Sequence, residues 1–178
     1  MKFNFFTRIE QNFFYGTFIG NYEKIFLLIF SPIFIILLII IKILSKIILI
    51  RFGIYRNDVI GNSICDLDIY LVKKKYLKNK SLDFFYPDVN KPPNSFFYKL
   101  AKRRIKINNF SKFFYFFCIN INYFNNHIVV MSKKPKSRDN EGILYKSESE
   151  IKFNNNDDIE GNKFLKSVGI NKKDKFIC

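Results

Sequence analysis

The sequence has little of what most catalytic and metal sites are built from. It contains one histidine, His127, and three widely separated cysteines with no CxxC pair. A metal site built from several histidines is therefore excluded, and the cysteines predict no disulfide framework, as expected in a reducing compartment. A Ser-His-Asp triad would have to use His127. We instead predict that this residue lies in a loop at the start of a short strand.

The common phosphate-binding and nucleophile motifs are also absent. The chain has no P-loop, no GxGxxG and no GxSxG. Asp66 and Asp68 have the spacing of a metal-binding DxD motif, but both fall in a predicted helix, where residues two apart point in directions about 200° apart. The sequence therefore predicts no metal site and no cofactor, and its motifs identify no catalytic residue.

The composition is unusual, with a single alanine, no tryptophan and 24 lysines against 6 arginines. Residues with AT-rich codons dominate, so the formal net charge of +15 partly reflects the genome. The cations are scattered apart from residues 73–75 and 102–104, and no nucleic-acid-binding motif accompanies them. Attraction to anionic lipids explains this charge as well as nucleic-acid binding would, and we predict no nucleic-acid partner.

The longest apolar run covers residues 25–41, which contain no charge and no glycine. A helix of this length can cross the hydrocarbon core of a bilayer, about 30 Å thick. The run is too uniform for a half-exposed surface helix, although a buried core helix of a soluble domain is the alternative. We predict a membrane anchor helix over residues 25–50, in contact with membrane lipids, preceded by an interfacial segment over residues 1–24.

The flanking charges predict the orientation of this anchor. Lysine and arginine are more frequent after the apolar run than before it. By the positive-inside rule, the chain is expected to cross the membrane once, with its C-terminal domain in the cytoplasm.

Strand and helix patterns alternate after the anchor. The predicted strands cover residues 47–52, 82–86, 105–107 and 128–131, and a last one begins near residue 173. The predicted helices cover residues 63–73, 95–104 and 154–168, and residues 113–121 form a further buried element. This alternation predicts an α/β fold over residues 51–178 with a small, mostly parallel sheet.

Three blocks in this order resemble a family of bacterial glycosyltransferases associated with surface-polysaccharide genes. The first contains Arg51-Phe52-Gly53, Ile60-Gly61, Asp66 and Tyr70-Leu71; the second contains residues 82–86, Asn94 and a helix ending at Arg104; the third contains Phe153, Gly161 and residues 164–178. The resemblance covers roughly residues 50–178 and implies a partial Rossmann-like lobe, the N-terminal part of a GT-B-like enzyme. It also implies that the chain ends before the C-terminal half, and that a second lobe is encoded downstream.

The resemblance implies a substrate contact at the turn that contains Gly61 and Asn62. The family has an Arg-Ile-Gly-His sequence at this turn, whereas this chain has Val59 and Asn62 at the arginine and histidine positions. Glycine allows close approach of a ligand, and asparagine can donate or accept a hydrogen bond. The implied partners are a nucleotide sugar and a glycan acceptor.

Two hypotheses for the function follow. The first is a membrane-anchored, glycosyltransferase-like N-terminal lobe that is inactive alone and is related to sugar transfer in surface-polysaccharide synthesis. The second is a small bitopic membrane protein with an interaction role and no enzymatic activity.

Overall fold

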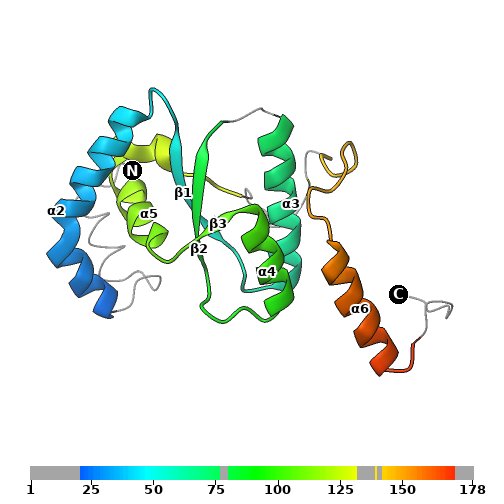
Figure 1. Cartoon of the computed structure of the whole chain (residues 1–178). Coiled ribbons are helices and arrows are strands. Elements are labelled where there is room, and N and C mark those ends of the chain that lie inside the picture. The colour runs from blue at the N-terminus through cyan, green and yellow to red at the C-terminus, as the bar shows by residue number, and fades with distance from the viewer. Residues whose placement is uncertain (1–20, 77–79, 132–138, 140–141, 171–178) are drawn as a thin grey trace.

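A computed structural model describes residues 21–76, 80–131, 139 and 142–170 of the chain (Figure 1). The predicted strand near residue 173, most of the interfacial segment and most of the basic loop at residues 132–140 lie outside these residues.

A small parallel sheet forms the centre of the fold. Its strands are β1 (Ile50–Tyr55), β2 (Leu82–Pro87) and β3 (Lys106–Ile107), paired in the order β1-β2-β3. Helix α3 (Ile60–Tyr76) connects β1 to β2, and α4 (Ser95–Arg104) connects β2 to β3. The prediction of an α/β fold with a small parallel sheet is confirmed.

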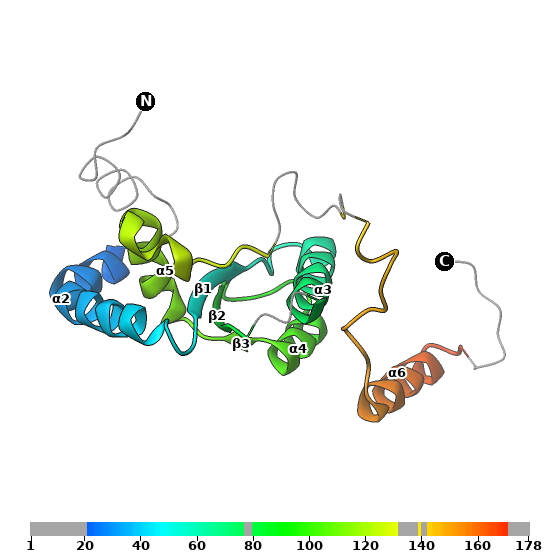
Figure 2. The same ribbon diagram turned by 90° about the horizontal axis from the view of Figure 1, so that it is seen from above.

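Helices cover both faces of this sheet (Figures 1 and 2). Helices α3 and α4 lie on one face, whereas α5 (Ser111–Asn120) lies on the other, next to α2 (Asn21–Leu44). The 3₁₀ helix η2 (Asn122–His127) then returns the chain to β1, where Ile128 pairs in parallel with Phe52. β1 therefore has β2 on one side and this returning segment on the other.

Each face of the sheet has its own apolar core. The core towards α2 and α5 is mostly aromatic and contains Leu27, Phe34, Leu38, Phe52, Phe116, Phe117, Cys118 and Phe124. The core towards α3 and α4 contains Tyr55, Leu67, Tyr70, Phe85, Ala101, Ile105, Val129 and Met131. Both clusters contain side chains of β1, because neighbouring residues of a strand point to opposite faces.

Short-range contacts define the ends of two helices. Asn94 caps α4 by accepting hydrogen bonds from the amides of Phe96 and Phe97. Asn154 and Asp157 form a capping box at the start of α6 (Asn155–Ser167), and Gly169 follows this helix with a φ of 79°. These short-range patterns fix the helix ends before any tertiary packing is considered.

Three sequence predictions are corrected by the structure. The apolar helix ends at Leu44 rather than at Ile50, because the β-branched residues that follow lead into β1. The predicted turn at residues 59–62 is the beginning of α3. Residues 128–131 form a single β-bridge instead of a strand.

The prediction that His127 is a loop residue is wrong. Its side chain is completely buried, and its Nδ1–H donates to the carbonyl of Ile50 over 2.6 Å. No hydrogen-bond partner for Nε2 exists among the described residues. Burial lowers the pKa of His127; the bond to Ile50 opposes this effect, and the charge of Lys42 adds to it. The neutral ring therefore ties the end of η2 to the start of β1.

This burial predicts a pH dependence of stability. Because the pKa is lowered in the folded state, the unfolded state binds more protons below about pH 6.5, so stability falls from about pH 7 to pH 5. His127→Asn keeps an N–H near the position of Nδ1 but cannot titrate. We expect its thermal melting temperature to change less than that of the wild type over this pH range. Equal slopes in the two proteins would contradict this role of His127.

Candidate functional site

The carboxyl ends of the strands meet at one edge of the sheet. β1 ends at Tyr55 and β2 at Pro87, and α3 and α4 begin a few residues later. Helix α3, which leads from β1 to β2, lies on one face of the sheet. Helix α5, which leads from β3 to the segment that pairs with β1 at Ile128, lies on the other face (Figure 2). In open α/β sheets, ligands bind outside the carboxyl ends of the strands, at the point where the connections diverge in this way.

Asn57 holds the loops at this edge together. It is 3% exposed, its Nδ2 donates to the carbonyl of Val89 over 2.7 Å, and its Oδ1 accepts from the amide of Val89 over 2.9 Å. The amide of Asp88 also donates to the carbonyl of Tyr55 over 3.0 Å. The loop after β1 and the loop after β2 are therefore fixed to each other, which gives the edge a defined shape.

Arg56 and Asp58 lie on either side of Asn57 and form a loose ion pair. Arg56 Nη2 lies 3.4 Å from Asp58 Oδ2, and the two side chains are 22% and 31% exposed. Arg56 Nη1 and Asp58 Oδ1 are buried, and neither has a hydrogen-bond partner among the described residues. Buried polar atoms normally have hydrogen-bond partners. Because Nη1 of Arg56 has none among the described residues, its N–H group can donate to an anion.

The beginning of α3 completes the candidate site. Its first turn contains no aspartate or glutamate, and Gly61 is exposed, with open space where a Cβ atom would stand. Unpaired amides and the helix dipole make such a terminus favourable for anions. Burial raises the pKa of the nearby Tyr55 to about 12, while a hydrogen bond with Ser63 opposes this shift. The hydroxyl of Tyr55 therefore remains protonated at neutral pH.

Gly61 and Asn62, the two residues predicted from the sequence, thus lie in the first turn of α3 at the carboxyl edge of the sheet. Arg56, Asn57 and Asp58 were not predicted as site residues. The signal that could have identified them is their position directly after β1, once that strand is known to be parallel to its neighbour.

Asp66 and Asp68, the two acidic residues of α3, are both buried. Asp68 Oδ1 accepts from the amide of Glu150 over 2.8 Å, which connects α3 to the segment before α6. Within the described residues, no three histidine, cysteine, aspartate or glutamate side chains are grouped so that they could hold a metal ion.

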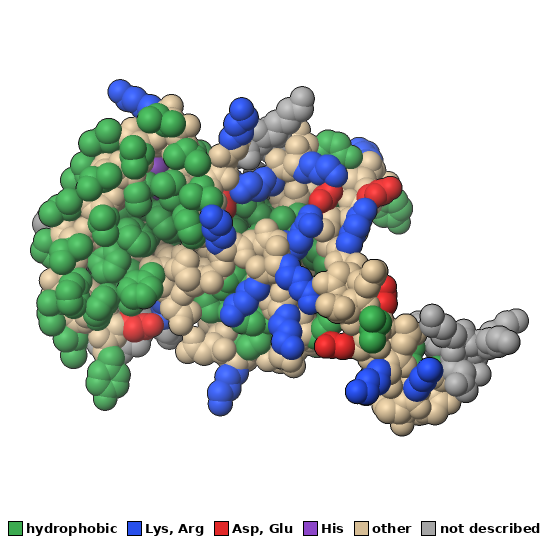
Figure 3. Space-filling view, in the orientation of Figure 1, with side chains coloured by type: hydrophobic (Ala, Val, Ile, Leu, Met, Phe, Trp, Pro, Cys, Tyr) green, Lys and Arg blue, Asp and Glu red, His purple; other side chains and the backbone are tan. Residues whose placement is uncertain are grey.

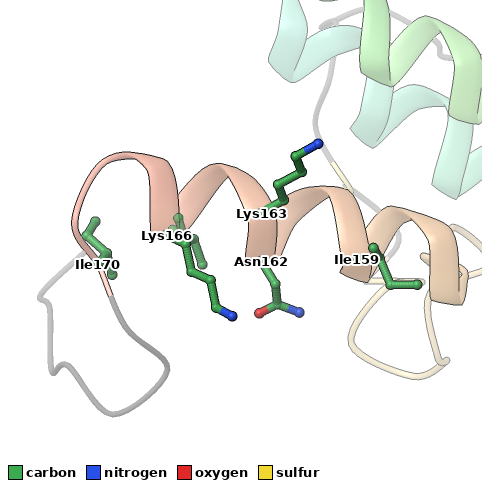
Figure 4. A pocket seen from close by; sticks show the side chains of 6 residues that line it. Ile159, Asn162, Lys163, Lys166 and Ile170 are labelled. Carbon is green, nitrogen blue, oxygen red and sulfur yellow. The ribbon is translucent and has the colours of Figure 1, made fainter.

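A separate hollow of about 510 Å³ lies along α6 and is lined by Ile159, Asn162, Lys163, Leu165, Lys166 and Ile170. Figure 4 shows Asn162 and Lys166 on one side of the helix, whereas Lys163 points to the other side. This helix projects from the α/β unit, so the hollow has no second wall from the sheet (Figure 1). Its described lining residues include no acid and base that could act together on a substrate.

No protein-family model, curated protein or solved structure matches this chain. The features of the chain that bear on its function are therefore the geometry of the carboxyl edge and the sequence blocks described above.

Proposed function

We propose that this chain is a membrane-associated, glycosyltransferase-like lobe of Rossmann type that binds a phosphate-bearing substrate at the carboxyl edge of β1. The observation that carries the proposal is the divergence of the connections on the two sides of β1. Such a divergence marks the ligand site in doubly wound α/β folds. The substrate class that fits best is a nucleotide sugar, or an acceptor that carries a diphosphate.

The charges at this edge support an anionic ligand. Arg56 Nη1 has no hydrogen-bond partner in the part of the chain that the structure describes, and the first turn of α3 contains no carboxylate to compete for its amides. The open space at Gly61 allows an oxygen atom of the ligand to approach the backbone. Together, these groups can bind and orient a phosphate without a metal ion.

Two described carboxylates lie at the same edge: Asp58, which is paired with Arg56, and Asp88, which is exposed in the loop after β2. No described histidine accompanies them there, because His127 lies at the end of η2. Sugar transfer also requires donor and acceptor to be held together in one cleft. We therefore propose that a second lobe supplies the other wall, and that this chain alone binds substrate but does not transfer sugar.

We also propose that the α/β unit lies on the cytoplasmic side of the membrane. The α/β unit is rich in lysine and arginine, and segments rich in these residues are retained on the cytoplasmic side, which supports this location whether or not α2 crosses the bilayer. A reporter enzyme that works only in the cytoplasm should be active when it is fused after Cys178. Activity of a reporter that works only outside the cytoplasm would overturn the orientation.

Titration of the full chain in detergent tests the substrate class. We expect pyrophosphate and at least one of UDP-glucose and GDP-mannose to bind in isothermal titration calorimetry. Arg56→Gln should weaken this binding about tenfold or more, since it removes a charge-assisted hydrogen bond. Gly61→Asp should abolish binding, because its carboxylate repels an anion. The same carboxylate is favourable at a helix N-terminus, so the thermal stability should be unchanged or slightly higher.

The matched control is Lys80→Gln, which removes the same charge from an exposed residue before β2, at the opposite edge of the sheet. It should leave the affinity unchanged. Equal losses in Lys80→Gln and Arg56→Gln would indicate nonspecific attraction to the positive chain. That result would contradict the site.

The alternative function, a bitopic protein with an interaction role, is favoured by one observation. Three apolar side chains of the α6 region are largely exposed, namely Ile159, Phe164 and Val168 at 64%, 66% and 53%. If the interaction role is correct, none of the phosphate compounds above should bind at the carboxyl edge of β1.

A further inference from the structure

Helix α2 is apolar all round, but its two faces have different surroundings. Leu27, Phe34 and Leu38 are buried against the aromatic core of the α/β unit. The opposite face is exposed over the whole length of the helix, for example at Ile25, Ile36 and Ile43, which are 58%, 57% and 65% exposed. A row of exposed isoleucines and leucines is unfavourable in water. In the space-filling view, apolar side chains cover this end of the molecule (Figure 3).

The buried face of α2 contacts the rest of the fold from its first turn onward. Lys112 Nζ of α5 lies 2.7 Å from Oε2 of Glu23, and the rings of Phe26 and Phe113 are 5.0 Å apart. In the middle of the helix, the ring of Phe34 packs against the ring of Phe114 at 5.1 Å.

The contacts continue to the last turn of α2. Lys42 Nζ lies 5.1 Å from the centre of the Tyr123 ring in η2, and Ile41 packs against the same aromatic core. The α/β unit therefore lies beside α2 along its full length instead of following it at one end (Figure 2).

These contacts limit how α2 can be placed in a bilayer. The helix has 24 residues and is about 36 Å long, comparable to the hydrocarbon core. If it crossed the bilayer with these contacts intact, α5 and η2 would enter the hydrocarbon with it. Exposed asparagines of η2 at positions 122, 125 and 126 would then lose their water. Crossing without them would require Phe34 and Leu38 to leave the aromatic core.

We propose that α2 lies in the plane of the membrane, with its exposed face in the acyl–headgroup boundary of an anionic bilayer and both of its ends on the same side. A helix with one face packed on a folded unit and the other in the interface keeps every contact described above. The formal net charge of +15 and the exposed Lys46 after the helix complement anionic headgroups. This placement does not depend on sugar transfer.

Cysteine labelling of the full chain in sealed membrane vesicles tests the placement. Cys65→Ser, Cys118→Ala and Cys178→Ser remove the native thiols. Tyr22→Cys or Ile47→Cys then adds one thiol at a position that is 91% or 87% exposed, near either end of α2. A membrane-impermeant maleimide should label both variants from the same side. Labelling of the two variants from opposite sides would show that α2 spans the bilayer and would overturn the proposal.

Flotation with phosphatidylcholine–phosphatidylglycerol vesicles tests the binding surface. Ile36→Asp should reduce recovery with the vesicles at least about tenfold. The control is Ile159→Asp, a change of the same kind at an exposed position of α6, which should float like the wild type. The wild type could instead fail to bind vesicles and self-associate, with Ile36→Asp being monomeric. The exposed face of α2 would then bind a second copy of the chain, and the proposal would be wrong. Neither assay involves nucleotide binding, so this proposal and the proposed function can fail independently.

Discussion

Replacing Asp83 with alanine should lower the free energy of unfolding by about 3 kcal/mol. The carboxylate is 1% exposed and lies near the start of β2. It accepts two hydrogen bonds from Arg51, at 2.8 and 2.9 Å, and one each from Lys74, Ser81 and Tyr70. Removing one partner of a buried ion pair costs about 3–5 kcal/mol, and the partial exposure of Arg51 and Lys74 puts this case at the lower end.

The expected change in melting temperature is about 6–12 °C for a domain of this size. Asp88→Ala is the matched control, because Asp88 is exposed and follows the other end of β2. It should change the melting temperature by no more than about 2 °C. Similar losses in the two variants would show that Asp83 has no special role.

The charge of Asp83 also predicts an acid transition. Burial opposes its ionisation, but hydrogen bonds from Arg51, Tyr70 and Lys74 outweigh burial and lower the pKa to about 2. The ionised form therefore stabilises the fold above about pH 4, and this contribution is lost as the pH falls towards 2. Asp83→Asn should show a smaller dependence of stability on pH in this range than the wild type.

Gly53→Ala should destabilise the fold by about 2–4 kcal/mol. A Cβ atom at this position would stand 2.4 Å from the carbonyl oxygen of Val129 and 2.8 Å from its Cγ1. That carbonyl belongs to the segment whose Val129 amide donates to Phe52 over 2.9 Å. To admit a methyl group, the segment must move away from β1, and Val129 and Met131 then lose part of their burial.

Gly61→Ala is the control for this change, since nothing lies within 4 Å of the Cβ position there. Alanine is favourable in a helix, so this variant should be as stable as the wild type or more stable, by up to about 1 kcal/mol. Thermal denaturation of the two variants provides the comparison. If Gly53→Ala melts like Gly61→Ala, the close approach of the segment after η2 to β1 is not important for stability.

Each residue of the sequence block Arg51-Phe52-Gly53 has a structural role. Arg51 pairs with Asp83, Phe52 packs in the core towards α5, and Gly53 admits the segment that returns to β1. None of the three residues lies at the carboxyl edge of the sheet. This block therefore serves pairing and packing within the fold, and the proposed substrate site must be tested at Arg56 and Gly61.

The features that were predictable from the sequence are those set by neighbouring residues. The strand at residues 82–86 was recognisable from a short apolar run stopped by Pro87, and α4 from the capping Asn94 and its basic last turn. The apolar character of α2 was equally recognisable, because its length and its low content of charged residues can be read directly from the sequence.

The features that were not predictable depend on distant contacts. The burial of His127 depends on the carbonyl of Ile50, which is 77 residues away. Likewise, the polar residues after β1 become a candidate site only when β2 and the segment at Ile128 pair on either side of that strand. The surroundings of α2 also depend on α5, a helix whose apolar sequence does not indicate its partner.

The most direct test of the substrate site is the amide NMR spectrum of the full chain in detergent during titration with pyrophosphate and the nucleotide sugars. The site predicts that the amide of Gly61 shifts strongly, together with that of Asn57, because a phosphate would lie at the first turn of α3. The amides of Gly161 and Gly169, in and just after α6, should not move. Shifts confined to α6, or no shift at Gly61 at saturating ligand, would contradict a phosphate-binding site at the carboxyl edge of β1.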